Sequence, residues 1–119
     1  RGFVNRHGES IPNYHFEDLE NLYQAYQARG LDNLSLIVDA NHANSRKKFW
    51  EQPRICRSVL HSCRQSRDIR SMVKGFMIES YLEEGHQSIG EHVYGKSITD
   101  PCLGWQATEK LIYEIAEWI

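Results

Sequence analysis

The chain has 119 residues, of which 14 are basic and 16 are acidic, giving a formal net charge of −2. This length allows at most one ordinary domain, and the mixed charge lacks the strongly basic patch typical of a nucleic-acid-binding domain. No apolar run is long enough to predict a membrane-spanning helix, and we expect no secretory leader. The composition therefore indicates partners other than nucleic acid and membrane.

The first part of the chain predicts one helix and one strand. Residues 1–14 are expected to form a polar loop, and a helix follows from about Phe16 to Arg29, with Gly30 as its stop. Its apolar residues recur at helical spacing. They are Leu19, Leu22, Tyr23 and Tyr26. An apolar run at 34–38 then predicts a strand buried on both faces. This strand leads into a polar loop around His42.

The second part of the chain predicts a helix, a strand, a long loop and a last helix. The first of these helices covers about Lys47 to Gln65, with a break or restart at Pro53. Its arginines recur in the manner of a solvated helix face. A strand at 72–78, a loop at 81–103 and a helix at about 105–118 complete the order. Helices that alternate with strands predict a parallel sheet. Two strands make a poor sheet alone, so we expect this chain to be a piece of a larger fold.

The cysteines predict reduced thiols. Cys56, Cys63 and Cys102 form no CxxC pair. Cys56 and Cys63 lie seven residues apart, about two turns along one helix, which is too far for a disulfide. Free cysteines of this kind favour a cytoplasmic protein.

One motif fits a phosphate-binding loop by its letters alone. The segment Gly90–Ser97 matches the pattern GxxxxGKS. Such a loop requires a buried strand before it and a helix starting at its lysine. The residues before it are polar, and Pro101 follows too closely for a continuous helix. We therefore reject a nucleotide-binding loop here.

Three groups able to bind a metal lie at or beyond the ends of the predicted strands. They are His42, Glu79 and Asp100. One imidazole nitrogen and two carboxylate oxygens suit a divalent ion such as Mn²⁺, Fe²⁺ or Zn²⁺. Their spacing fits ligands supplied by successive loops at the carboxyl ends of strands. Taken singly, each residue also fits a helix N-cap or a hydrogen-bonding loop residue, and this alternative stays open.

Three segments together resemble one enzyme family. The segments are Val38–Ser45, Gly75–Ser88 and Tyr94–Trp105, of which the run Tyr-Gly-Lys-Ser-Ile-Thr-Asp ending at Asp100 is the most specific. They are similar to the C-terminal third of type I 3-deoxy-D-arabino-heptulosonate 7-phosphate (DAHP) synthases. The resemblance extends over essentially the whole chain.

The resemblance implies an α/β fold, namely the C-terminal portion of a (β/α)8 TIM barrel, with about strands 7–8 and helices 6–8. Residues 1–119 then form one fragment of a single barrel domain without an internal boundary. The implied reaction joins phosphoenolpyruvate to erythrose 4-phosphate and releases phosphate, at the start of aromatic amino-acid synthesis. A homo-oligomer is expected.

The resemblance also implies roles for individual residues. His42, Glu79 and Asp100 are implied metal ligands, and Arg1 is an implied phosphoenolpyruvate-binding residue. Asp100 is further implied to orient erythrose 4-phosphate. The family's fourth metal ligand is a cysteine early in the barrel that none of the three cysteines here matches, so we expect the isolated fragment to be inactive.

The chain also departs from the family pattern. The loop at 3–10 is longer than the usual link, and Asn41 precedes the histidine where serine is more familiar. The related octulosonate 8-phosphate synthase is one alternative, against which the run ending at Asp100 argues. A non-catalytic remnant or interaction module is another.

Overall fold

The carboxyl ends of two parallel strands lie side by side in this computed structural model, which describes all 119 residues. The elements in chain order are β1 (Phe3–Val4), β2 (Ser10–Ile11), α1 (Phe16–Ala28), β3 (Leu36–Asp39), α2 (His42–Ser45), the 3-10 turn η1 (Phe49–Glu51), α3 (Gln52–Gln65), α4 (Arg67–Met72), β4 (Val73–Met77) and α5 (Trp105–Trp118). This order confirms the predicted alternation of helices and strands. The fold is mixed α/β with two small sheets.

The pairing of β3 with β4 fixes where the following residues go. The strands are parallel, and Asp39 pairs with Met77 at their carboxyl ends. The Ala40 N–H donates to the Met77 carbonyl at 3.0 Å, which extends the ladder by one residue. Because both strands end at the same edge, the segments after them start as neighbours in space.

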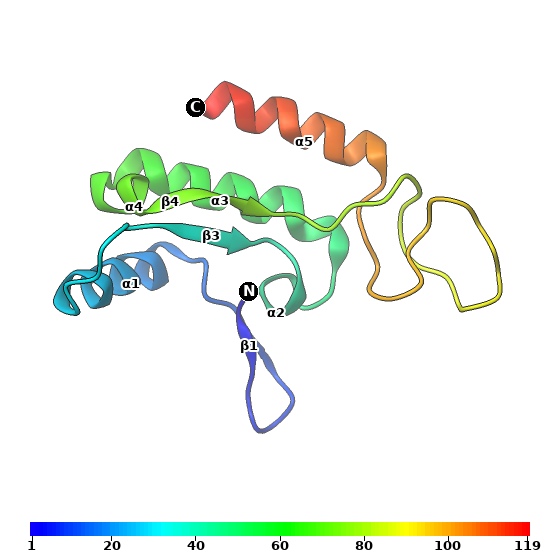
Figure 1. Cartoon of the computed structure of the whole chain (residues 1–119), viewed down its shortest axis with the longest axis horizontal. Coiled ribbons are helices and arrows are strands. Elements are labelled where there is room, and N and C mark those ends of the chain that lie inside the picture. Colours follow the sequence, from blue (N-terminus) through cyan, green and yellow to red (C-terminus); the bar gives the residue numbers. More distant parts are fainter.

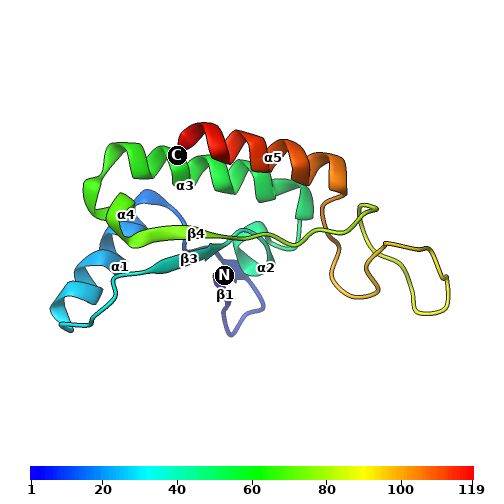
Figure 2. The ribbon, with the colours of Figure 1, turned by 45° about the horizontal axis from the view of Figure 1, so that its top comes forward.

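The helices α3 and α5 cover one side of the strand pair and run alongside each other (Figures 1 and 2). Their apolar faces are built from residues at helical spacing, as the sequence predicts. The helices α1 and α4 and the loop before α5 also contribute to the core. It contains Leu19, Val38, Ile55, Val59, Ile69, Met72, Leu103 and Leu111. On the strands, Ile37 and Met77 remain about half exposed, at 56% and 48%.

The arginines of α3 and α4 are exposed, which confirms the solvated face. Two of them also connect α3 to α5. Arg57 Nε donates to Glu114 Oε2 at 2.8 Å, and the Arg64 guanidinium lies 3.7 Å from the centre of the Trp118 ring. Cation–π and ion-pair contacts at such exposed sites contribute modestly.

The prediction of a loop at 1–14 is wrong in part, because β1 and β2 form a short antiparallel hairpin there. Its turn depends on Asn5, whose Oδ1 accepts the His7 N–H at 2.9 Å, and on Gly8, whose φ of 80° lies in the left-handed region. Strands of two residues are too short to show an alternation of apolar and polar side chains, and this hairpin depends on its turn residues instead. The pattern used to find strands therefore missed the hairpin.

The predicted start of the second helix is also wrong. α3 begins at Gln52, and Pro53 lies in its first turn. Before it, Arg46 and Lys47 have φ values of 54° and 60°. This left-handed backbone cannot continue a helix. The predicted polar loop around His42 instead contains the helical turn α2, and α4 precedes the second strand where no element was expected.

The long segment at 81–103 has no helix or named strand, as predicted, but its two arms are tied together. Isolated bridges join Ser80 to Leu103, Gly85 to Cys102 and His86 to Ser97. The rejected phosphate-loop motif lies within this segment, and no strand ends directly before Gly90 and no helix starts at Lys96. Gln87 anchors the tip, since its side-chain amide donates to the Val93 and Lys96 carbonyls at 2.8 and 2.9 Å.

The cysteines are free, as predicted. Cys56 is completely buried in the core. Burial raises the pKa of its thiol to about 12. Cys56 is therefore an unreactive core residue. None of the helices is long and apolar enough to cross a membrane.

Replacing Leu111 by alanine tests the packing of α5. Leu111 is 1% exposed, and removing a buried leucine side chain of this kind costs about 2 to 5 kcal/mol. Urea unfolding of the Leu111→Ala variant should show that loss. The neighbouring Lys110→Ala variant is the matched control, because its side chain is 77% exposed and such changes stay within about 0.5 kcal/mol. Equal effects of the two substitutions would contradict this packing.

Candidate metal centre

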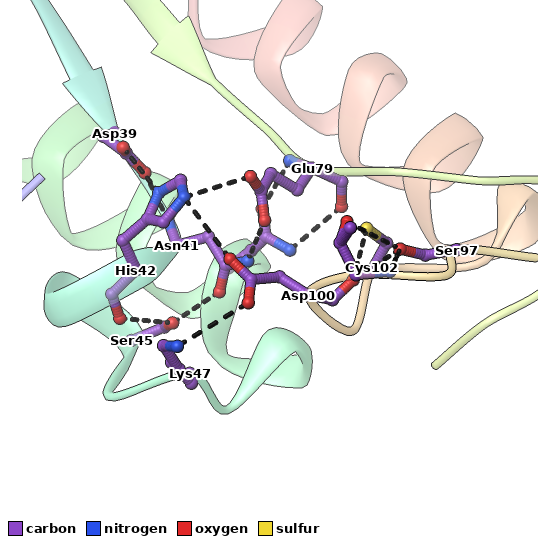
Figure 3. A network of polar contacts seen from close by, with 11 residues as sticks. Asp39, Asn41, His42, Ser45, Lys47, Glu79, Ser97, Asp100 and Cys102 are labelled. Carbon is purple, nitrogen blue, oxygen red and sulfur yellow. Dashed lines mark hydrogen bonds and ion pairs between the residues drawn. The ribbon is translucent and has the colours of Figure 1, made fainter. Parts of the chain in front are cut away.

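The structure brings together the three candidate metal ligands that the sequence indicates. His42 lies in α2 after β3, Glu79 follows β4, and Asp100 lies in the loop before α5. His42 Nε2 is 3.2 Å from Glu79 Oε1 and 3.8 Å from Asp100 Oδ2 (Figure 3). One ligand atom from each residue lies within 4.8 Å of the others. Residues far apart in the sequence therefore form one cluster.

This arrangement fits a single divalent ion. Bonds of about 2.0 to 2.2 Å from three donors to one ion leave neighbouring donor atoms about 3 to 4 Å apart. The distances of 3.2 and 3.8 Å lie in this range. One nitrogen and two carboxylate oxygens suit Mn²⁺, Fe²⁺ or Zn²⁺ in donor chemistry. The residues present therefore fit the metal that the family resemblance implies.

Asp39 orients the imidazole of His42. The backbone of His42 has a φ of 51°, a left-handed conformation that histidine adopts more readily than most residues. Its Nδ1 lies 2.8 Å from Asp39 Oδ2, and Asp39 is 2% exposed. An Nδ1–H that donates to this carboxylate leaves the Nε2 lone pair directed at Glu79 and Asp100. Figure 3 shows His42 between Asp39 on one side and these two carboxylates on the other.

Two buried amides hold Glu79. The Gln52 side chain makes a pair of hydrogen bonds with the Glu79 backbone, donating to its carbonyl at 3.0 Å and accepting from its N–H at 2.9 Å. Asn41 Nδ2 donates to Glu79 Oε2 at 2.6 Å. Neither Asn41 nor Gln52 is among the site residues that the sequence indicates. No feature of the sequence points to Gln52, because only the fold brings α3 against the end of β4.

Asp100 is fixed through its backbone. Its carbonyl accepts from Ser97 Oγ at 2.7 Å and from Cys102 Sγ at 3.3 Å. Its side chain faces His42 and also lies 3.6 Å from Lys47 Nζ. Burial raises the pKa of the Cys102 thiol, and the nearby Glu79 and Asp100 carboxylates raise it further. Cys102 therefore remains a neutral thiol at neutral pH.

Arg1, the fourth site residue indicated by the sequence, lies beside this cluster. It lines a cavity of about 650 Å³ that His42 and Asp100 also line, together with the cations Arg46 and Lys47. The Asn44 N–H donates to the Arg1 carbonyl at 3.1 Å, which ties the base of the hairpin to α2. The cavity is therefore lined by two of the candidate metal ligands and by positively charged side chains.

These features are those of an α/β enzyme fragment with side chains gathered at the carboxyl ends of parallel strands. A family model, described as the DAHP synthetase I family, matches residues 3–112. The chain therefore belongs to the DAHP synthetase I family. This result confirms the resemblance seen in the sequence.

Curated relatives agree with this assignment. The chain is 40% identical over 119 residues to the Trp-sensitive phospho-2-dehydro-3-deoxyheptonate aldolase of Enterobacter agglomerans, covering 98% of this chain and 33% of the relative. It is 38% identical over 112 residues to the Phe-sensitive enzyme of that name from Escherichia coli K12, covering 92% and 31%. The chain thus spans about a third of the length of the curated relatives that it matches. These relatives are DAHP synthases, which are transferases of aromatic amino-acid biosynthesis.

A solved structure shows the same fold. The chain superposes on the phospho-2-dehydro-3-deoxyheptonate aldolase of Francisella tularensis SCHU S4 with a TM-score of 0.81 and 26% identity, covering 91% of this chain and 31% of that one. This likeness is consistent with a piece of a TIM barrel.

Replacing Asp39 by asparagine tests the orientation of His42. Loss of the carboxylate that faces Nδ1 should weaken metal binding by about 10- to 100-fold, as is typical when the partner of a metal-binding histidine is removed. The measurement is competition for Mn²⁺ against a chelator of known affinity. Asp32→Asn is the control, since Asp32 is exposed. Unchanged affinity in Asp39→Asn would show that Asp39 does not support a metal ligand.

Proposed function

We propose that the protein containing this chain condenses phosphoenolpyruvate with erythrose 4-phosphate to give DAHP and phosphate, the first step of the shikimate pathway. The main support for this proposal comes from His42, Glu79 and Asp100, which lie together at one end of the parallel strands in a chain of this family. The charged cavity beside them supports it, because both substrates are anions.

The proposed metal ligands are His42, Glu79 and Asp100. A bound divalent ion supplies Lewis-acid chemistry, which polarises a sugar aldehyde oxygen. Asp39 keeps the His42 imidazole in the tautomer that presents Nε2. Asp100 lines the cavity as well as facing His42, which supports its proposed role in orienting erythrose 4-phosphate.

Arg1 is the proposed phosphoenolpyruvate-binding residue. A guanidinium group binds two oxygens of a phosphate or carboxylate at once through its planar fork. Arg46 and Lys47 line the same cavity, so they add positive charge where an anionic substrate would lie. Asn44 positions the Arg1 backbone relative to α2.

We assign β3 and β4 to the seventh and eighth strands of the barrel and α1, α3 and α5 to its sixth, seventh and eighth helices. The parallel pairing of β3 with β4 and the order of the helices support this assignment. The remaining strands would cover the exposed face that carries Ile37 and Met77. We further propose a cytoplasmic homo-oligomer, and we propose that residues 1–119 alone do not catalyse the reaction.

The test uses the longest natural reading frame that contains residues 1–119. Loss of phosphoenolpyruvate is followed with erythrose 4-phosphate and Mn²⁺, and then repeated with a chelator. Turnover should require the metal, and His42→Ala should lower kcat/KM by more than about 100-fold, because it removes a metal ligand. Substitution of Arg1 by alanine should raise the KM for phosphoenolpyruvate.

The matched control is His61→Ala, because His61 is an exposed histidine of α3 outside the cluster. Its kcat/KM should stay close to that of the wild type. A folded, metal-loaded protein that consumes no phosphoenolpyruvate would overturn the proposed reaction. Equal losses in the two histidine variants would overturn the role of His42.

A further inference from the structure

We propose that Asn41 is a positioning residue that restricts Glu79 to a single metal-facing oxygen and thereby selects small transition-metal ions over Ca²⁺. This inference rests on the metal centre of the proposed function. Asn41 is not a proposed metal ligand, and its hydrogen bond goes to the other oxygen of Glu79. It acts through the carboxylate of Glu79.

The two oxygens of Glu79 have different surroundings. Oε1 lies 3.2 Å from His42 Nε2, on the side of the candidate centre. Oε2 instead accepts a hydrogen bond from Asn41 Nδ2 at 2.6 Å. The amide holds Oε2 on the Asn41 side and occupies one of its lone pairs, which disfavours binding of an ion through both oxygens. Glu79 therefore presents one oxygen to the metal.

The orientation of the Asn41 amide is fixed by a separate contact. Ser45 Oγ donates to Asn41 Oδ1 at 2.6 Å. With Oδ1 engaged as the acceptor, the NH₂ group must face Glu79. Asn41 is 2% exposed and Ser45 is 3% exposed, so water has little access to the contact between them.

Hydrogen bonds also hold the backbone of Glu79 in place. Gln52, which is fully buried, holds both the N–H and the carbonyl of Glu79. The Asn41 N–H also donates to Asp39 Oδ1 at 2.9 Å, while the other oxygen of Asp39 contacts His42. Asn41 therefore connects Asp39, which orients His42, with the side chain of Glu79.

Denticity is the property that this arrangement controls. Ca²⁺ takes many oxygen ligands and often binds carboxylates through both oxygens, whereas transition ions with imidazole ligands accept fewer donors. Removing the Asn41 amide would free Oε2, and Glu79 could then bind an ion through both oxygens. The site would then lose affinity for a transition ion and discriminate less well against Ca²⁺.

The experiment uses the longest natural reading frame that contains the chain, with Co²⁺ as the probe. In Asn41→Ala, we expect Co²⁺ affinity to fall by about 10- to 100-fold, as for other residues that hold a metal ligand. The visible bands of bound Co²⁺ should weaken, since their intensity falls as the coordination number rises. Ca²⁺ should compete more effectively for the site than it does in the wild type.

Two further variants separate this role from general destabilisation. Ser62→Ala is the control, because Ser62 is a buried polar residue of α3, 5% exposed, whose hydroxyl donates to the Ser58 carbonyl rather than to any residue of the candidate centre. It should leave the Co²⁺ spectrum unchanged. Ser45→Ala keeps Asn41 in place and removes only the group that orients its amide, so it should show a smaller loss in the same direction.

The outcomes distinguish this inference from the proposed function. If the wild type binds Co²⁺ and both Asn41→Ala and Ser45→Ala keep its affinity and spectrum, the inference is wrong while the metal centre stands. An equal spectral change in Ser62→Ala would also overturn it. If the wild type binds no Co²⁺, the metal centre and this inference fail together.

Discussion

The parallel pairing of β3 with β4 is the constraint on which the rest of the site depends. Asp39 and Met77 end the two strands as partners, and the Ala40–Met77 hydrogen bond carries the pairing one residue further. His42 and Glu79 then leave the same edge of the sheet within a few residues. A shift of one residue in register would turn the side chains of one strand to the opposite face. The distance between these two residues is therefore set by the backbone ladder.

Buried polar side chains convert this placement into a defined geometry. Asp39, Asn41 and Gln52 are each at most 2% exposed, and every buried side-chain nitrogen or oxygen has a hydrogen-bond partner. Because a buried polar group left unpaired costs about 1 to 3 kcal/mol, such a network strongly favours one arrangement. The left-handed backbone of His42 is held by the same contacts. Rigidity at the candidate centre thus comes from residues that are not themselves proposed ligands.

Much of this architecture could be predicted from the sequence, because apolar periodicity reports directly on burial. The order of the main helices and strands and their parallel pairing follow from it. The hairpin of β1 and β2 and the helix α4 were missed, since they depend on turn residues and on tertiary contacts.

The candidate site also has a part that the sequence predicts and a part that only the fold creates. His42, Glu79 and Asp100 could be singled out because their residue types bind metals and follow predicted strands, and the structure brings them together. Asp39 carried a weak signal, namely its position three residues before His42. Gln52 carried none, because its contact with Glu79 spans 27 residues and exists only in the folded chain. Local sequence identifies reactive groups more readily than the groups that support them.

The candidate metal centre is best tested by a crystal structure of the longest natural reading frame containing this chain, grown with Mn²⁺ and measured by anomalous scattering. We expect one strong anomalous peak within bonding distance of His42 Nε2, Glu79 Oε1 and a carboxylate oxygen of Asp100, with Asp39 still on Nδ1 of the histidine. A fully occupied Mn²⁺ site elsewhere, with these three side chains free of metal, would contradict it.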